Sequence, residues 1–276
     1  MIRTKSVPVP NTVRRFAGHS AAGLLTLIVI AAAIGAVHVF SGPKPVPNDS
    51  YTQQQIQGPL DARPNERSRH LVVIAHNAGD ASSTIAAALN HDAQFVEIDT
   101  TAIQGQLRAR HDIRPRSPAD YIARSTTVNR AWEQAGASGV LLDLKTNGLA
   151  TTSLIRALAK RHAASRVLVS TKDIGSLTQL QATVPHLVRL LSIGSSDELR
   201  HFLHHSRTAT TGIQGVAIAG QLLNHNTMSQ LLARHLWIQA WTVNTMRRTN
   251  ELANLGVNGI TTDNLTIIET LSNTEP

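Results

Sequence analysis

Ionisable residues stand at the ends of several short apolar runs in this chain. The runs are LVVIA, QFV, QLRAR and GVLL, and the residues at their ends are His76, Glu97, Asp99, His111, Asp143 and Lys145. If such runs are parallel strands of one barrel, their ends all face the same mouth. Carboxylates gathered there can hold a metal ion, and histidines can transfer protons.

The spacing within two of these groups supports a shared pocket. Glu97 and Asp99 are two residues apart, and so are Asp143 and Lys145. Because side chains alternate across a strand, both members of each pair face the same side. Both pairs can therefore point into one pocket.

Strand-like and helix-like stretches alternate along the chain, and this pattern predicts a parallel sheet with helical crossovers. The helical spacing of apolar residues is visible, for example, at 83–92, 127–136, 154–163 and 227–236. Strands are predicted at 71–75, 94–99, 106–110, 139–145, 166–170, 187–192, 213–218, 236–243 and 258–262. A barrel of this kind has eight strands. We therefore assign 106–110 to a short hairpin outside the barrel.

Six short motifs follow one another between about residues 70 and 268. They are His76-Asn77-Ala78-Gly79, Glu97-Ile98-Asp99, His111-Asp112, Asp143-Leu144-Lys145, Trp241-Thr242-Val243-Asn244 and Gly256-Val257-Asn258-Gly259-Ile260-Thr261-Thr262-Asp263. In type and order they resemble the motifs of the glycerophosphodiester phosphodiesterase family. The resemblance implies a TIM (β/α)8 barrel that hydrolyses phosphoric diesters.

The resemblance also implies roles for individual residues. His76 and His111 would be the acid–base pair, and one divalent cation, Mg²⁺ or Ca²⁺, would be the cofactor. The residues that would hold this cation are Glu97, Asp99 and Asp143. Lys145 would contact the phosphate and Trp241 would form a wall of the substrate cleft. In the family's reaction the neighbouring glycerol hydroxyl attacks phosphorus, so a cyclic phosphate forms first.

Two positions depart from the family pattern. Asp143 stands where the family usually has Glu. The Asp-x-Lys pattern of Asp143 and Lys145 is, however, similar to that of the related sphingomyelinase D branch. Asn77 stands where the family normally has Arg, and it would contact the phosphate with a neutral amide in place of a bidentate cation. An alternative function is therefore a barrel that binds phosphate-bearing surface molecules without hydrolysing them.

The first seventy residues differ in composition from the rest. Residues 1–20 form a basic tail, and 21–40 form an apolar stretch whose length suits a membrane-spanning helix. The stretch is long for a signal-peptide core, which favours an uncleaved anchor over a cleaved signal. With the basic tail in the cytoplasm, a polar, proline-containing linker at 41–68 would carry the barrel, 69–276, outside it.

Composition excludes some classes of site and partner. The chain has no cysteine, so disulfides and thiolate metal sites are excluded. Its net charge of +8 favours anionic membrane surfaces or acidic polymers, and it equally serves solubility. Aromatic residues are only 3% of the chain and no recognition motif is present, so we expect no nucleic-acid partner. We expect a single-pass membrane protein that acts on a glycerophosphodiester or a phospholipid-derived substrate.

Other polar residues have simpler readings. His201, His204 and His205 have helical spacing, but the polar stretch that follows them at 206–211 contains no acid, so we expect a solvated helix face. Asp263 is expected to cap the last helix or to orient the barrel mouth. Asp112 either positions His111 or binds backbone. The segment 112–126 is either a short cover over the substrate cleft or a solvated loop.

Overall fold

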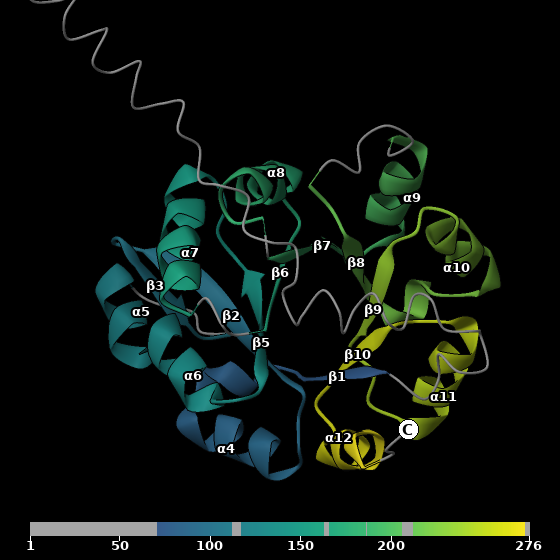
Figure 1. Cartoon of the computed structure of the whole chain (residues 1–276), viewed down its shortest axis with the longest axis horizontal. Helices are drawn as coiled ribbons and strands as arrows, with labels where there is room; N and C mark the ends of the chain where they lie inside the picture. Colours follow the sequence, from purple (N-terminus) through teal and green to yellow (C-terminus); the bar gives the residue numbers. More distant parts are fainter. Residues whose placement is uncertain (1–70, 112–116, 163–165, 186, 206–211, 274–276) are drawn as a thin grey trace, which may run out of the picture. The chain divides into compact units, whose positions relative to one another are not determined.

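Eight parallel strands close into a barrel in the computed structural model, which describes residues 71–111, 117–162, 166–185, 187–205 and 212–273 (Figure 1). Their order around the ring is β1-β10-β9-β8-β7-β6-β5-β2, and β1 pairs with β2 to close it. The strands are β1 (Val72–Ala75), β2 (Phe95–Ile103), β5 (Gly139–Leu144), β6 (Val167–Thr171), β7 (Val188–Ile193), β8 (Gly215–Ala219), β9 (Trp237–Trp241) and β10 (Gly259–Thr262). The predicted TIM-like barrel is confirmed.

The predicted hairpin outside the barrel is also confirmed. Strand β3 (Gln106–Ala109) pairs antiparallel with the far half of β2, and a short strand β4 (Thr126–Thr127) pairs antiparallel with β3. Strand β2 runs past the predicted end at residue 99 because its last residues pair with β3. The hairpin thus extends one barrel strand beyond the mouth.

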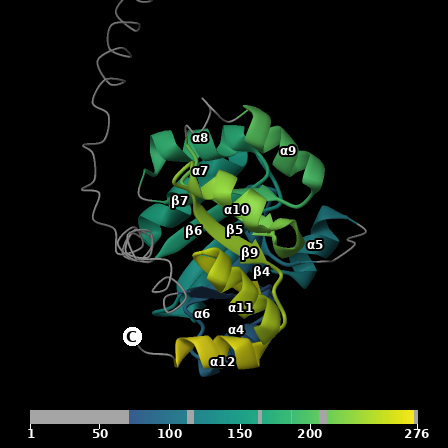
Figure 2. The ribbon, with the colours of Figure 1, turned by 90° about the vertical axis from the view of Figure 1, so that its right-hand side faces the viewer.

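Helices surround the strand ring in both views (Figures 1 and 2). They are α4 (Ser82–Asn90), α5 (Pro118–Arg124), α6 (Val128–Ala135), α7 (Leu149–Arg161), α8 (Ile174–Thr183), α9 (Ser196–His205), α10 (His225–Leu232), α11 (Met246–Leu255) and α12 (Leu265–Ser272). Two 3-10 helices are η2 (Ala78–Asp80) and η3 (Gly220–Leu222). Several helices begin at a polar side chain that accepts a backbone N–H of the first turn, such as Asp173 of α8 and Thr245 of α11.

Two apolar clusters hold the barrel together. The larger lies between the strands and the helices, and the smaller fills the inside of the strand ring. Phe95 and Trp237 are the largest side chains of the inner cluster, and both are fully buried. Glycine makes room for them: a Cβ at Gly139 would lie 2.3 Å from the Phe95 ring, and one at Gly259 would lie 3.0 Å from the Trp237 ring. This plug closes the barrel below the polar mouth.

The predicted basic tail at 1–20, the apolar stretch at 21–40 and the linker at 41–68 all lie outside the described residues. Within the ranges that the structure describes, no helix combines the length and the apolar composition needed to cross a membrane.

Candidate functional site

The predicted site residues continue the inward-facing series of their strands. Phe95 on β2 and Leu141 on β5 both belong to the inner cluster. Because side chains alternate along a strand, Glu97 and Asp143, each two residues further on, face the same interior. Period-two alternation therefore brings polar groups to the mouth from strands whose lower halves are apolar.

A cavity of about 300 Å³ opens at this mouth. It collects side chains from strands that lie far apart in the sequence. The residues that line it are His76, Glu97, His111, Leu141, Asp143, Lys145, Ser170, Lys172, Ser192, Ala217, Gln239, Trp241 and Thr242. Of the predicted site residues, Asp99 and Asn77 are not part of this lining.

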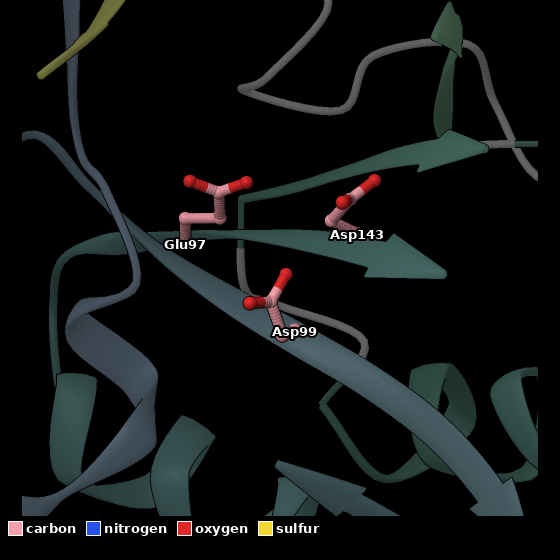
Figure 3. A group of neighbouring side chains, drawn as sticks. All are labelled: Glu97, Asp99 and Asp143. Atoms are coloured by element: carbon pink, nitrogen blue, oxygen red, sulfur yellow. The ribbon is translucent and has the colours of Figure 1, made fainter. Parts of the chain in front are cut away.

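Three carboxylates gather beside the cavity (Figure 3). One oxygen from each of Glu97, Asp99 and Asp143 lies within 4.8 Å of the other two. Glu97 is 7% exposed and Asp99 is fully buried. The buried Glu97 Oε2 and Asp99 Oδ2 have no hydrogen-bond partner. Buried carboxylate oxygens that lack partners are costly, so this cluster is built for a cationic ligand.

Burial and mutual repulsion raise the pKa values of the buried carboxylates in this cluster, while the charge of Lys145 opposes the rise. Burial, followed by repulsion from the neighbouring carboxylates, raises the pKa of Glu97 well above its usual value. Burial also raises the pKa of Asp99, although Lys145 opposes the shift. Lys145 Nζ lies 2.7 Å from Asp99 Oδ1 and also donates to Asp143 Oδ2. Burial works against the charge on Lys145, but Asp143 and Asp99 outweigh it and raise its pKa.

The donor set fits a hard divalent cation. It offers carboxylate oxygens alone, the ligands that Mg²⁺ and Ca²⁺ prefer, with neither sulfur nor nitrogen in the group. A divalent charge would relieve the repulsion that raises the pKa of Glu97.

His76 follows β1 and is oriented by a carboxylate at the end of β10. Its Nδ1 lies 2.6 Å from Asp263 Oδ1, while its Nε2 lies 3.9 Å from Glu97 Oε2. Asn244 supports this pair, because its Nδ2 donates to Asp263 Oδ2 over 2.8 Å. Burial tends to raise the pKa of Asp263, but the hydrogen bonds from Asn244 and His76 outweigh it and lower the pKa.

One of the two roles predicted for Asp263 was to cap the last helix. Asp263 does not have this role. The N-cap of α12 is Asn264, whose side chain accepts from Thr266 N. Asp263 instead has the second predicted role, because it orients His76 at the barrel mouth. Its contact with His76 follows from the parallel register of β1 and β10, in which Ala75 and Thr262 are partners.

His111 reaches the cavity from the hairpin. Its backbone N–H is held by Asp80, whose two carboxylate oxygens each lie 3.0 Å away. Its Nε2 lies 3.8 Å from Asp99 Oδ2. The ring centroids of His76 and His111 are 6.3 Å apart. Sequence reasoning missed Asp80, and no signal in its neighbourhood marks it.

Asn77 has a local structural role. Its backbone is left-handed, with φ of 51°, a conformation that Asn tolerates better than most residues. Its backbone N–H donates to Glu97, and its side-chain Nδ2 lies 3.5 Å from His76 Nδ1.

Sequence analysis predicted only part of the cavity wall formed beyond β5. Trp241 was expected there, and it lines the cavity together with Lys172 and Ser192. Lys172 directly follows β6, so the same strand-end argument that selected Lys145 would have found it. Its Nζ donates to Glu198 Oε1 over 2.8 Å.

The remaining expectations concern residues away from the cavity. His201, His204 and His205 are exposed on α9, and the rings of His201 and His205 stack at 4.2 Å. Among the described residues, the possible metal-binding group is the three carboxylates of the mouth. Asp112 lies outside the described residues. In the predicted covering segment, residues 118–124 form helix α5.

Comparison with known sequences assigns a family to this chain. The sequence model of the glycerophosphoryl diester phosphodiesterase family matches residues 119–267. This range contains Asp143, Lys145 and Trp241. A search of curated proteins finds no match.

Solved structures share the fold. One is a phosphodiesterase from Oleispira antarctica in complex with its product sn-glycerol-3-phosphate, with 20% identity and a TM-score of 0.59 over 72% of this chain and 95% of that one. Another is a glycerophosphodiester phosphodiesterase from Thermotoga maritima, with 14% identity and a TM-score of 0.57 over 73% and 98%. A third, from Parabacteroides distasonis, has 16% identity and a TM-score of 0.58 over 73% and 96%.

Proposed function

Because the chain belongs to the glycerophosphoryl diester phosphodiesterase family and is a phosphoric diester hydrolase, we propose that its cavity hydrolyses glycerophosphodiesters by acid–base catalysis between two histidines. The observation that carries the proposal is the pairing of His76 and His111, 6.3 Å apart, beside a buried carboxylate cluster. Two imidazoles at this separation can serve the two oxygens on either side of one phosphorus atom.

We assign the general base to His76. Asp263 accepts a hydrogen bond at Nδ1, so the proton of the neutral ring lies there and Nε2 keeps its lone pair. Nε2 is also the nitrogen that faces Glu97 and the cavity. It is therefore placed to take the proton from an attacking hydroxyl, either of the substrate's glycerol or of water.

His111 then serves as the general acid toward the leaving alcohol. Both rings line the cavity with their centroids 6.3 Å apart, so a phosphate bound between them would meet one histidine on each side. The backbone contact with Asp80 keeps the hairpin end in position while the ring transfers its proton.

Glu97, Asp99 and Asp143 would hold one divalent cation, Mg²⁺ or Ca²⁺. When bound, this cation would neutralise charge on the phosphate and so let a nucleophile approach. Lys145 adds a second positive charge at the same edge of the cavity. Asn77 supplies a neutral amide where the family pattern has an Arg. This replacement alone does not favour the alternative function, a barrel that binds phosphate-bearing molecules without hydrolysing them.

The test is turnover by the full-length chain with sn-glycero-3-phosphoglycerol, in Mg²⁺, Ca²⁺ or chelator. We expect hydrolysis that is lost with chelator and in His76→Ala and His111→Ala. His204→Ala is the matched control, because this histidine is exposed on α9. Equal turnover in wild type and both site variants would refute the proposal. Phosphorus NMR distinguishes the nucleophile, since attack by the glycerol hydroxyl requires a cyclic phosphate.

We also propose that residues 21–40 anchor the chain in the cell membrane, with the barrel on the extracytoplasmic side. The support is the length of this apolar stretch and the basic tail that precedes it. Cell fractionation tests the anchor, since it predicts that the chain stays with membranes after an alkaline wash. Added protease should digest the barrel in intact spheroplasts. Protection from the protease would refute the orientation.

A further inference from the structure

Lys172 is a second cation on the cavity wall that the proposed reaction does not use. Asp143 on β5 pairs with Ser170 on β6 in parallel register. Two residues further along, Lys145 and Lys172 therefore leave neighbouring strands on the same inward side, and both line the cavity. The register places two lysines side by side at one edge of the mouth.

The two lysines differ in what neutralises them. Lys145 is held by Asp99 and Asp143, which belong to the cavity's own carboxylate cluster. The partner of Lys172 is Glu198, which does not line the cavity. Lys172 thus lines the cavity, while its counter-ion is a residue outside the cavity lining.

The ion pair between Lys172 and Glu198 can be broken at low cost in free energy. The Lys172 side chain is 64% exposed, and an ion pair in such a position contributes little to stability. Glu198 keeps other partners if Lys172 turns away, because its Oε2 accepts from the backbone N–H of Gly194 and Ser195 at 2.6 and 3.1 Å. A ligand anion can therefore draw Lys172 inward without leaving Glu198 without hydrogen bonds.

The charge of Lys172 disfavours a cationic group at this end of the cavity. Trp241 could pack against such a cation, but Lys172 lines the same cavity and would repel it. Ser192 adds a hydroxyl to the wall next to Lys172. The chemistry of this wall is that of a subsite for an anion on a polar alcohol.

We propose that Lys172 is a specificity residue that recognises a second anionic group on the alcohol half of the substrate. The inference rests on the proposed function, and it deepens that function by naming the substrate class. The substrate is a glycerophosphodiester whose second alcohol carries a phosphate or a carboxylate. The reacting phosphate lies between the histidines, and the second anion lies between Lys172 and Ser192.

The test compares four diesters with the full-length chain. Their second alcohols are glycerol, glycerol bearing a terminal phosphate, glycerate and choline. We expect the highest kcat/KM for a diester whose second alcohol is anionic. Comparing the glycerol phosphate diester with the glycerate diester identifies the preferred anion. Lys172→Met should lower the ratio of kcat/KM for the anionic over the glycerol diester by about tenfold, and Lys172→Glu should reverse it toward choline. Lys160→Met, an exposed lysine on α7, is the matched control and should keep the ratio.

A binding measurement separates this inference from the proposed function. Calorimetry compares glycerol 1,3-bisphosphate with sn-glycerol 3-phosphate in wild type and Lys172→Met. A selective loss of affinity for the bisphosphate in Lys172→Met supports the role of Lys172, whether or not any diester is hydrolysed. Absence of diester hydrolysis would refute only the proposed function. An unchanged affinity ratio, or an unchanged kcat/KM ratio with active enzyme, would overturn the role of Lys172.

Discussion

At the scale of single residues, the proposed acid–base pair depends on a carboxylate outside the cluster of Glu97, Asp99 and Asp143. Asp263 holds His76 Nδ1 at 2.6 Å and is itself held by Asn244. Such an outer carboxylate fixes both the tautomer and the ring orientation of a functional histidine. Its removal should slow proton transfer more than it weakens substrate binding.

We expect Asp263→Asn to lower kcat by about 10- to 100-fold with little change in KM. The variant keeps the shape of the side chain but loses the charged acceptor for Nδ1–H. Steady-state kinetics on a glycerophosphodiester measure both constants. Asp197→Asn, at an exposed position on α9, is the matched control. An unchanged kcat would mean that Asp263 has only a structural role.

Asn77 allows a second test at this scale. We expect Asn77→Arg to raise kcat/KM on simple glycerophosphodiesters, because a guanidinium can grip phosphate through two charged hydrogen bonds. The variant should also be less stable by about 1 kcal/mol, since the backbone at residue 77 is left-handed. Urea unfolding measures that cost, and Asn77→Gly provides the strain-free comparison. No gain in activity would mean that the site is built for another substrate.

At the scale of elements, the hairpin formed by the end of β2 and by β3 matters most for the site. The barrel strands deliver their residues by alternation, whereas His111 arrives on an antiparallel extension of β2. Its backbone N–H is held by Asp80 in η2. The Asp80 side chain thus links the hairpin to the start of the barrel.

We expect Asp80→Ala to reduce kcat by roughly tenfold, because His111 loses its backbone anchor while both histidines remain present. The variant should also lose about 1 kcal/mol of stability, the usual cost of an N–H that loses its partner. Kinetics and urea unfolding measure the two effects. Asp80→Asn keeps one acceptor oxygen and should recover most of the activity. Equal kcat in Asp80→Ala and wild type would contradict this role.

At the scale of the whole molecule, the buried carboxylates make the free energy of unfolding depend on pH. Burial, followed by the charges of Asp143 and Asp99, raises the pKa of Glu97 in the folded state. A group with a raised folded pKa binds its proton more tightly when folded. Its contribution is therefore fully present below the unfolded pKa and is lost as the pH rises through the folded pKa.

We expect Glu97→Gln to be more stable than wild type at pH 8 in chelator, and the difference to shrink toward pH 4. Glutamine mimics the protonated acid, so the variant does not pay for a buried charge. Saturating Ca²⁺ or Mg²⁺ should reverse the order, because a ligand at 100 times its Kd adds about 2.7 kcal/mol to the wild type. Urea midpoints in each condition measure the effect. Equal metal stabilisation in both proteins would exclude Glu97 as a ligand.

Most of the barrel was predictable from the sequence because its signals are local. Alternation within each strand decides which side chains face inward, and it correctly placed Glu97 beside the cavity and Asp143 on its wall. The order of strands and helices predicted the parallel sheet with helical crossovers, the family resemblance predicted the closed barrel, and the surplus strand predicted the hairpin outside it. Errors fell at element ends, as in β2, where pairing with β3 extends the strand.

By itself, the sequence determined the alternation of strands and helices, the inward series and the residue types at the mouth, since these follow from neighbours a few positions apart. Only the tertiary structure decided how those residues support one another. Asp263 meets His76 across 187 positions because β10 closes onto β1, and Glu198 meets Lys172 because α9 begins beside the end of β6. Such contacts depend on strand register and helix placement, which are set by packing of the whole barrel and have no local signal in the chain.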